Sequence, residues 1–217
     1  MMKINQFIDH TLLKPEATPK QVLQLCEEAQ KYNFAAVCIN PIYVPLAVSR
    51  LNSTQILVCT VVGFPLGNTI SRIKAAETDN AVANGAREID MVIPVGQLKS
   101  RDYPYVEQDI RIVVAAAAPL AIVKVILETC LLEEAEIITA CKIAQQAGAH
   151  FVKTSTGFNK AGATVEQVAL MRKTVGNEMG VKAAGGIRDY ETALKMINAG
   201  ANRLGTSASV AIIEASK

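Results

Sequence analysis

The segment Ala121-Ile122-Val123-Lys124-Val125-Ile126-Leu127 places one lysine between two runs of apolar residues. Its β-branched residues lie on both faces of an extended chain, which is typical of a buried parallel strand. Six further short runs share this character, and they are residues 35–39, 56–62, 89–93, 151–154, 181–184 and 203–205. Their starts lie about 20 to 35 residues apart, the length of one strand-plus-helix unit. The sequence therefore predicts repeated βα units.

The segments between these runs carry helix end signals. Thr18-Pro19-Lys20-Gln21 provides an N-cap, a proline at the first helical position and a glutamine for a capping box. Thr164-Val165-Glu166-Gln167 begins another helix in the same way. Gly85, Gly148 and Gly200 are each placed to end a helix in the left-handed conformation. We therefore expect helices to alternate with the strands.

Eight parallel strands would close this pattern into a barrel. Seven strands are evident, and Ile8-Asp9-His10-Thr11-Leu12 is the best candidate for the eighth. No linker or change in composition divides the chain, so we expect one α/β domain over residues 1–217, a parallel eight-stranded (β/α)8 TIM barrel. An open doubly wound sheet is the alternative, but no G-x-G-x-x-G follows a first strand.

Composition limits the kind of protein this chain can be. Half of its 217 residues (50%) are apolar and 19% are charged, so the chain can bury a substantial core. The net charge of +2 lacks the basic excess typical of a nucleic-acid partner. The longest apolar run, residues 112–123, is interrupted by Pro119 and is shorter than the roughly 20 residues that cross a bilayer. We expect neither nucleic acid nor membrane as a partner.

Histidine and cysteine content narrows the chemistry further. The two histidines, His10 and His150, cannot build a three-histidine zinc site, and we expect neither a metal nor another cofactor. The chain has five cysteines, which are Cys26, Cys38, Cys59, Cys130 and Cys141. None forms a C-x-x-C pair, and four lie in apolar patterns, so we expect reduced thiols and a cytoplasmic location.

Charged residues inside the predicted strands point to the chemistry. Lys124, Lys153, Lys182 and Asp90 each have apolar or small neighbours in a strand. Strand alternation then directs the neighbours toward the helices and the charged groups toward the barrel axis. An unpaired buried ammonium is costly, so these groups must lie beside one another or beside water.

Two interpretations of this cluster remain. It is either a buried set of ion pairs without chemistry or a site with an activated amine. A second ammonium nearby disfavours the charge on the first and exposes a lone pair, which can attack an aldehyde or ketone and form a Schiff base. Asp90 can carry protons in such a reaction. The convergence of three lysines and one aspartate favours the amine, and the shortage of histidine favours a metal-free route.

Glycine-rich segments follow the last two predicted strands. Gly185-Gly186-Ile187-Arg188 follows the strand that contains Lys182, and Gly205-Thr206-Ser207 follows the final strand. The loops after strands 7 and 8 of such barrels often bind phosphate through backbone N–H groups. The two segments together predict a phosphate site.

Several segments closely resemble the 2-deoxyribose-5-phosphate aldolase family. The most specific are F-V-K-T-S-T-G at 151–157, V-K-A-A-G-G-I-R at 181–188 and V-V-G-F-P-L-G at 61–67. The remaining matches are I-D-H-T-L at 8–12, V-C-I-N-P at 37–41, E-I-D-M-V at 88–92 and L-E-T at 127–129. One departure is Phe158, which stands where some members have a lysine.

The resemblance implies a class I aldolase on a (β/α)8 barrel that reversibly joins acetaldehyde and glyceraldehyde 3-phosphate into 2-deoxyribose 5-phosphate. It makes Lys153 the Schiff-base lysine, Lys182 the lysine that tunes it, and Asp90 the proton relay. The supporting residues that it implies are Lys124, Asp9 and Thr11. The phosphate-binding residues, from the resemblance and the glycine segments together, are Gly157, Gly185, Gly186, Gly205 and Ser207. We also expect a homodimer or higher homo-oligomer.

Three other functions stay open at this point. One is a different phosphosugar enzyme on the same barrel, such as an isomerase or a decarboxylase, because a fold does not imply one function. Another is a phosphometabolite sensor without catalysis, and the third is a pyridoxal-phosphate protein, which would also form an imine with lysine. Borohydride trapping of an aldehyde adduct and the absorbance of the purified protein would separate these cases.

Overall fold

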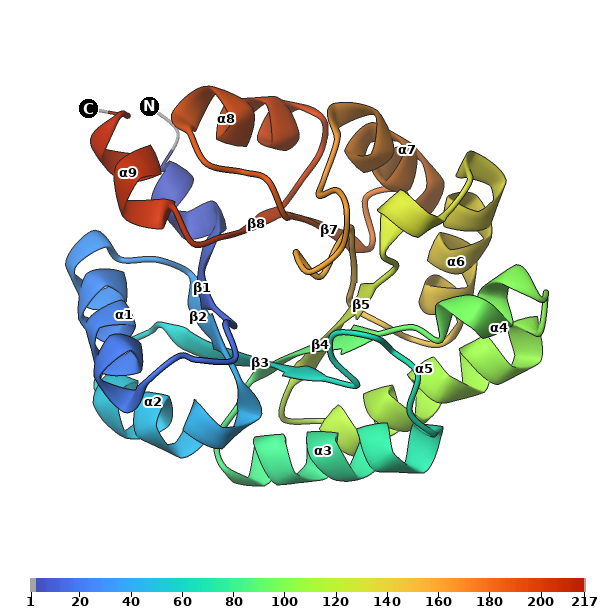
Figure 1. Cartoon of the computed structure of the whole chain (residues 1–217), viewed down its shortest axis with the longest axis horizontal. Coiled ribbons are helices and arrows are strands. Elements are labelled where there is room, and N and C mark those ends of the chain that lie inside the picture. The colour runs from blue at the N-terminus through green and yellow to red at the C-terminus, as the bar shows by residue number, and fades with distance from the viewer. Residues whose placement is uncertain (1–2, 217) are drawn as a thin grey trace.

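Eight parallel strands close into a barrel in the computed structural model, which describes residues 3–216 (Figure 1). Each strand pairs with the next along the chain, and β8 pairs with β1 to complete the ring. The strands are β1 Ile8–Leu12, β2 Ala36–Ile39, β3 Leu57–Val62, β4 Glu88–Val92, β5 Ile122–Ile126, β6 Phe151–Lys153, β7 Gly180–Ala184 and β8 Arg203–Thr206. The predicted TIM barrel is confirmed, including its eighth strand.

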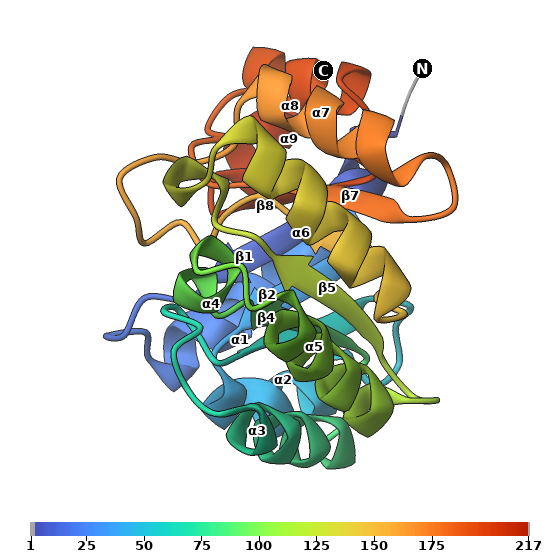
Figure 2. The same cartoon turned by 90° about the vertical axis from the view of Figure 1, so that its right-hand side faces the viewer.

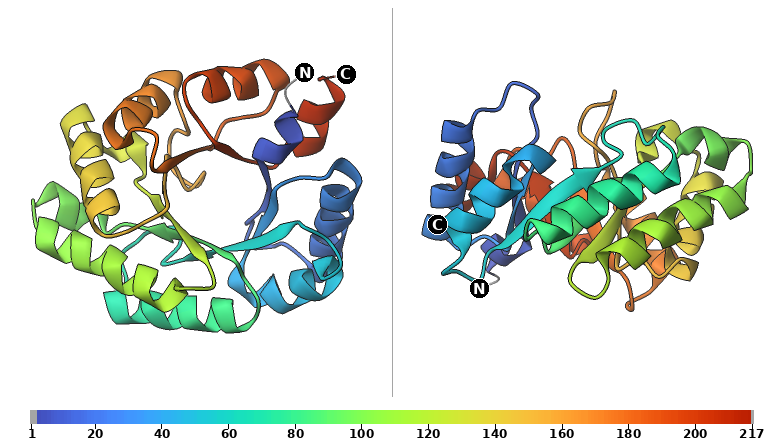
Figure 3. Two further views of the ribbon diagram at one scale, coloured as in Figure 1. Left: turned by 180° about the vertical axis from the view of Figure 1, so that it is seen from behind. Right: turned by 90° about the horizontal axis from the view of Figure 1, so that it is seen from below.

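Helices form a ring around these strands, seen from the front in Figure 1 and from behind in Figure 3. The α-helices are α1 Pro19–Tyr32, α2 Val44–Leu51, α3 Ser71–Ala83, α4 Val95–Lys99, α5 Tyr103–Ala117, α6 Glu134–Gln146, α7 Val165–Val175, α8 Tyr190–Asn198 and α9 Ser209–Glu214. Short 3-10 helices occupy Ile4–Phe7, Pro41–Tyr43 and Thr129–Leu131. Figure 2 shows α5 and α6 on the outside of β5. Among the described residues, no helix combines the length and apolar character needed to cross a membrane.

The predicted helix ends are confirmed, with one difference. Thr18 and Gln21 form a complete capping box at the start of α1. Thr164 accepts a hydrogen bond from the backbone N–H of Gln167, but the side chain of Gln167 does not complete a box. Its amide oxygen instead accepts a bond from the hydroxyl of buried Thr129 at 2.8 Å. A buried hydroxyl needs such a partner more than an exposed helix end does.

The glycines predicted to end helices have the left-handed backbone that their positions require. Gly85, Gly148 and Gly200 have φ values of 99°, 83° and 109°. Each lies between a helix and the following strand, where the chain must reverse direction within a few residues. Glycine adopts this conformation without the steric conflict that a Cβ atom would introduce.

Alternation along the strands separates the core from the barrel interior. In β4, Ile89 and Met91 belong to the apolar core between sheet and helices, whereas Asp90 makes its contacts inside the barrel. The barrel interior contains an apolar part and a charged part. A small apolar cluster covers the side formed by β2 and β3, and it consists of Leu13, Ala36, Cys38, Cys59 and Val61, with Phe64 packed against it. The charged residues face this cluster from the opposite side.

A second buried ion pair lies outside the barrel, between α3 and α5. Lys74 Nζ is 2.6 Å from Asp109 Oδ2 and donates at 2.8 Å to the carbonyl of Val92, the last residue of β4. Both charged side chains are completely buried, and Asp109 Oδ1 has no hydrogen-bond partner among residues 3–216. The Lys74 stem also explains Gly63, because a Cβ there would come within 2.8 Å of Lys74 Cε. The pair therefore ties both helices to the end of the strand that carries Asp90.

Lys74→Met should lower the free energy of unfolding by about 3–5 kcal/mol, because it leaves the carboxylate of Asp109 buried without a cation. Lys74→Met combined with Asp109→Leu removes both charges and should recover much of that loss. Urea unfolding followed by circular dichroism measures both variants. A double variant as unstable as the single one would contradict this account.

Candidate functional site

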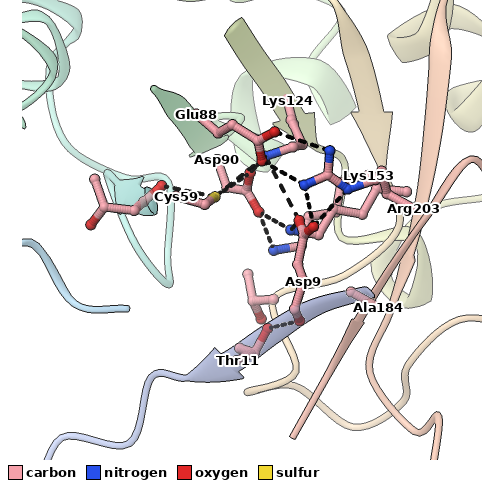
Figure 4. A network of polar contacts seen from close by, with 12 residues as sticks. Asp9, Thr11, Cys59, Glu88, Asp90, Lys124, Lys153, Ala184 and Arg203 are labelled. Carbon is pink, nitrogen blue, oxygen red and sulfur yellow. Dashed lines mark hydrogen bonds and ion pairs between the residues drawn. The ribbon is translucent and has the colours of Figure 1, made fainter. Parts of the chain in front are cut away.

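Asp90 lies at the centre of a group of buried charges (Figure 4). Its Oδ1 atom is 2.8 Å from Lys124 Nζ, and its Oδ2 atom is 2.8 Å from Lys153 Nζ and 2.7 Å from Lys182 Nζ. Strand register explains the convergence, since Asp90 is paired with Lys124 and Lys153 with Lys182 on neighbouring strands. All four side chains point inward, so the predicted cluster is present in the structure.

The structure adds two residues that the sequence interpretation missed. Arg203 of β8 donates to both carboxylate oxygens of Glu88, at 3.0 and 2.9 Å, and its Nε donates to Asp9 Oδ1 at 2.6 Å. Glu88 also pairs with Lys124 at 2.6 Å, and Asp9 with Lys182 at 2.5 Å. The signal was available for Glu88, which lies two residues before Asp90 and therefore on the same inward face. Arg203 is paired with inward-facing Lys182 on the neighbouring strand, a register that only the structure shows.

We call these seven side chains the charged network: Asp9, Glu88, Asp90, Lys124, Lys153, Lys182 and Arg203. Three are carboxylates and four are cationic groups, so the network has one positive charge in excess when all are ionised. The cations differ in their number of carboxylate partners within 4.0 Å. Within the described part of the chain, Lys124 has three, Lys182 has two, and Lys153 has Asp90 alone.

Burial and charge act in opposite directions on these groups. Burial alone would raise the pKa of Asp90, but the three lysine ammoniums around it hold that pKa well below its usual value of 3.8. Burial would lower the pKa of Lys182, yet the carboxylates of Asp9 and Asp90 raise it above 10.5. The pKa of Lys124 is raised in the same way, chiefly by Asp90. These groups therefore remain ionised near neutral pH.

A cavity of about 350 Å³ opens above the charged network. Its walls contain seven of the predicted site residues, which are Thr11, Lys153, Gly157, Gly185, Gly186, Gly205 and Ser207. Lys153 is the one lysine of the charged network among the residues that line this cavity, while the others lie deeper in the barrel. Exposed Lys14 and Arg188 also line it, and the sequence interpretation did not assign them to the site. The cavity is thus lined by the Lys153 amine and by two exposed cationic side chains, Lys14 and Arg188, which we call the cationic rim.

The glycine segments shape one wall of this cavity. Gly157, Gly185 and Gly186 have φ values of 85°, 85° and 80°. A Cβ at Gly162 would come within 2.1 Å of the Gly185 carbonyl oxygen, so the loops after β6 and β7 pack backbone against backbone. Ser207 is exposed and lies two residues before the first residue of α9, whose N-cap is Ala208. Thr206 accepts the Ala208 N–H and shapes the turn.

Thiols and carboxylates also gather at the base of the site. One ligand atom each from Cys38, Cys59 and Asp90 lies within 4.8 Å of the others. The Cys59 thiol donates to Asp90 Oδ1 at 3.2 Å and accepts from Lys124 Nζ at 3.3 Å. Lys124 Nζ therefore contacts two of these three side chains, Cys59 and Asp90.

This chain is similar to known proteins over nearly its whole length. A family model described as DeoC/LacD family aldolase matches residues 3–211. Deoxyribose-phosphate aldolase of Streptococcus sanguinis is 59% identical over 98% of this chain and 96% of that protein. The Clostridium tetani enzyme of the same name is 56% identical over the full length of both chains. A tetrameric deoxyribose phosphate aldolase from Aeropyrum pernix superposes with a TM-score of 0.91 at 33% identity, covering 98% of this chain and 90% of that one.

The closed barrel and these relationships define an aldolase, and therefore a lyase, of the (β/α)8 type. Within that type, the chain belongs to the DeoC/LacD family of aldolases. The match extends across nearly all of the described chain, so the family assignment covers every strand of the barrel and the whole charged network.

The shifted pKa values predict how stability depends on pH. Carboxyls with a lowered pKa, Asp9 and Asp90, stabilise the fold fully above 3.8 and lose that contribution as pH falls further. Lysines with a raised pKa, Lys124 and Lys182, stabilise it fully below 10.5 and lose that contribution as pH rises further. Urea unfolding should therefore show declines on both sides, with slopes of about 1.4 kcal/mol per pH unit for each proton exchanged. Constant stability between pH 4 and pH 2.5 would contradict the acid part.

Proposed function

We propose that this protein is a deoxyribose-phosphate aldolase that cleaves 2-deoxy-D-ribose 5-phosphate reversibly into acetaldehyde and D-glyceraldehyde 3-phosphate through a Schiff base on Lys153. The family relationship supports the reaction. The observation that carries the assignment of the nucleophile is the position of Lys153, which reaches both the cavity and Asp90. We further propose that residues 1–217 act as one barrel domain.

A neutral amine is needed for attack on a carbonyl. The charged network has one positive charge in excess, so the loss of one lysine proton relieves repulsion among the others. Lys153 has a single carboxylate partner, which it shares with two other lysines, whereas Lys182 and Lys124 have more. Lys153 is therefore the favoured nucleophile. Lys182 stays charged and stabilises the ionised form of Asp90.

The chemistry then follows from the amine. Lys153 Nζ attacks the aldehyde carbon of the open-chain sugar, and loss of water gives an iminium ion. The C2–C3 bond breaks as the C3 hydroxyl loses its proton, and the bond's electron pair moves toward the iminium nitrogen. Glyceraldehyde 3-phosphate leaves, and the remaining enamine takes up a proton and is hydrolysed to acetaldehyde. Asp90 lies within 2.8 Å of all three lysine amines, including Lys153 Nζ, and is suited to carry these protons.

The cationic rim of the cavity supports a phosphate at its outer end. We propose that Gly157, Gly185, Gly186, Gly205 and Ser207 provide backbone N–H groups and a hydroxyl for it. Arg188, beside these loops, adds a guanidinium that suits phosphate oxygens. A sensor would also use this rim, but it would have no need of an amine between Asp90 and the cavity. Thr11 and Asp9 are proposed as supporting groups, and Thr11 donates to the Asp9 carbonyl.

Assembly and location are further proposals. The tetrameric relative from Aeropyrum pernix supports a homo-oligomer, either a dimer or a higher state. Five free cysteines, four of them buried, support a reducing cytoplasmic location. The partners in the reaction are a phosphosugar and two aldehydes, and no metal or cofactor is assigned a step.

Borohydride trapping with acetaldehyde, followed by peptide mass mapping, tests the two lysine roles. Lys153→Met removes the nucleophile and should abolish trapping. Lys182→Met keeps the nucleophile but removes one of the ammoniums bound to Asp90, so trapping should be slower and should still map to Lys153. An adduct mapped to Lys182, or trapping by the Lys153→Met variant at another barrel lysine, would show that the roles are assigned wrongly.

Ser207→Asp tests the phosphate site. A carboxylate at this exposed position should repel the substrate phosphate, so KM for deoxyribose 5-phosphate should rise at least tenfold, as expected for about 1.4 kcal/mol of repulsion. KM for unphosphorylated deoxyribose should change little, because that substrate carries no charge there. Steady-state kinetics with both substrates makes the comparison. An equal loss with both would place the phosphate elsewhere.

A further inference from the structure

Glu128 is a buried carboxylate that no step of the proposed mechanism uses. It lies two residues after the end of β5 and is 4% exposed. Its backbone has φ 56° and ψ 60°, the left-handed region that residues with a Cβ rarely occupy. Such conformations persist where surrounding contacts hold them, and they concentrate at functional sites.

Both carboxylate oxygens of Glu128 contact one residue. Oε1 accepts the backbone N–H of Thr156 at 3.1 Å, and Oε2 accepts the Thr156 hydroxyl at 2.5 Å. No lysine or arginine among residues 3–216 forms an ion pair with Glu128. The cost of burying this carboxylate is therefore offset mainly by Thr156.

This contact continues the sheet beyond the end of β6. The strand stops at Lys153, but the backbone N–H of Thr129 still donates to the Thr154 carbonyl at 2.9 Å. At the next position the chain after β5 offers Thr156 a side-chain oxygen of Glu128 instead of a carbonyl. A carboxylate such as that of Glu128 makes a stronger hydrogen bond than a neutral carbonyl does. The stronger bond helps to hold Thr156, which lies beyond the regular hydrogen bonds of β6.

Thr156 connects Glu128 to the wall of the cavity through hydrogen bonds. Its Oγ1 atom accepts the backbone N–H of Phe158 at 3.1 Å, and residues 156–158 all line the cavity. The Phe158 ring in turn meets Phe64 edge to face, with ring centroids 5.3 Å apart. Through one threonine, Glu128 therefore sets the backbone that includes Gly157, on the phosphate side of the cavity.

We propose that Glu128 is a positioning residue that holds the wall formed by residues 156–158 against the phosphorylated end of the substrate. The proposal rests on the proposed function, because it assumes a phosphate beside Gly157. Lys153 is held independently, since its carbonyl accepts from Leu127 and its strand pairs with β7. Loss of the Glu128 carboxylate should consequently disturb phosphate binding while imine formation continues.

Glu128→Gln places an amide N–H₂ group against one of the two Thr156 donors. We expect KM for deoxyribose 5-phosphate to rise about tenfold, the effect of losing one hydrogen bond to a charged group. The kcat should stay within about twofold, and KM for unphosphorylated deoxyribose and the rate of acetaldehyde trapping should stay near the wild-type values. Glu133→Gln makes the same change at an exposed helix cap five residues along, and it should alter stability without altering this KM ratio.

Two further variants exclude a purely structural role. Glu128→Gly suits the left-handed backbone, which offsets part of the stability lost with the two Thr156 hydrogen bonds, while KM for the phosphorylated substrate still rises. In a double-mutant cycle, Thr156→Val should add little to Glu128→Gln, because both remove the same contact. Equal changes in KM for both deoxyribose substrates, or additive effects in the cycle, would overturn the proposal. Absence of trapping in the wild-type protein would instead overturn the proposed function.

Discussion

Charge compensation inside a closed barrel is the constraint on which the rest of this structure depends. The charged side chains inside the barrel are buried, so each ionised group there requires an opposite charge within hydrogen-bond distance. Asp90 satisfies three lysines at once, and Arg203 joins Glu88 to Asp9 across the barrel. Removing one member leaves its partners buried and unpaired, which costs far more than a surface ion pair contributes.

This constraint also explains how the interior is divided. An apolar cluster lies on the β2 and β3 side, while the charged side chains come from β1 and from β4 to β8. Of the charged network, Lys153 lines the cavity and the other six residues do not. The same arrangement that compensates the charges therefore places one amine where a substrate carbonyl can reach it, with a carboxylate directly behind it.

Local patterns in the sequence predicted much of the fold. The capping residues at Thr18 and the left-handed glycines depend on contacts a few residues apart, and the structure agrees with them. The inward direction of Lys124, Lys153, Lys182 and Asp90 follows from strand alternation alone. The side chain of Gln167 was predicted to turn back toward its own helix, but it bonds to Thr129, which is 38 residues away. That choice belongs to packing, which no local pattern contains.

The sequence by itself determined the strands, most helix ends and four of the seven inward charges, because each follows from backbone sterics and short-range periodicity. Only the tertiary structure decided which charges meet. Lys182 lies 92 residues from Asp90 and Arg203 lies 115 from Glu88, and they are brought together when β8 closes on β1. Closure of the barrel also placed Lys153, and not Lys124 or Lys182, at the cavity. Depth along a barrel is a property of the whole ring of strands, so no single segment of the chain specifies it.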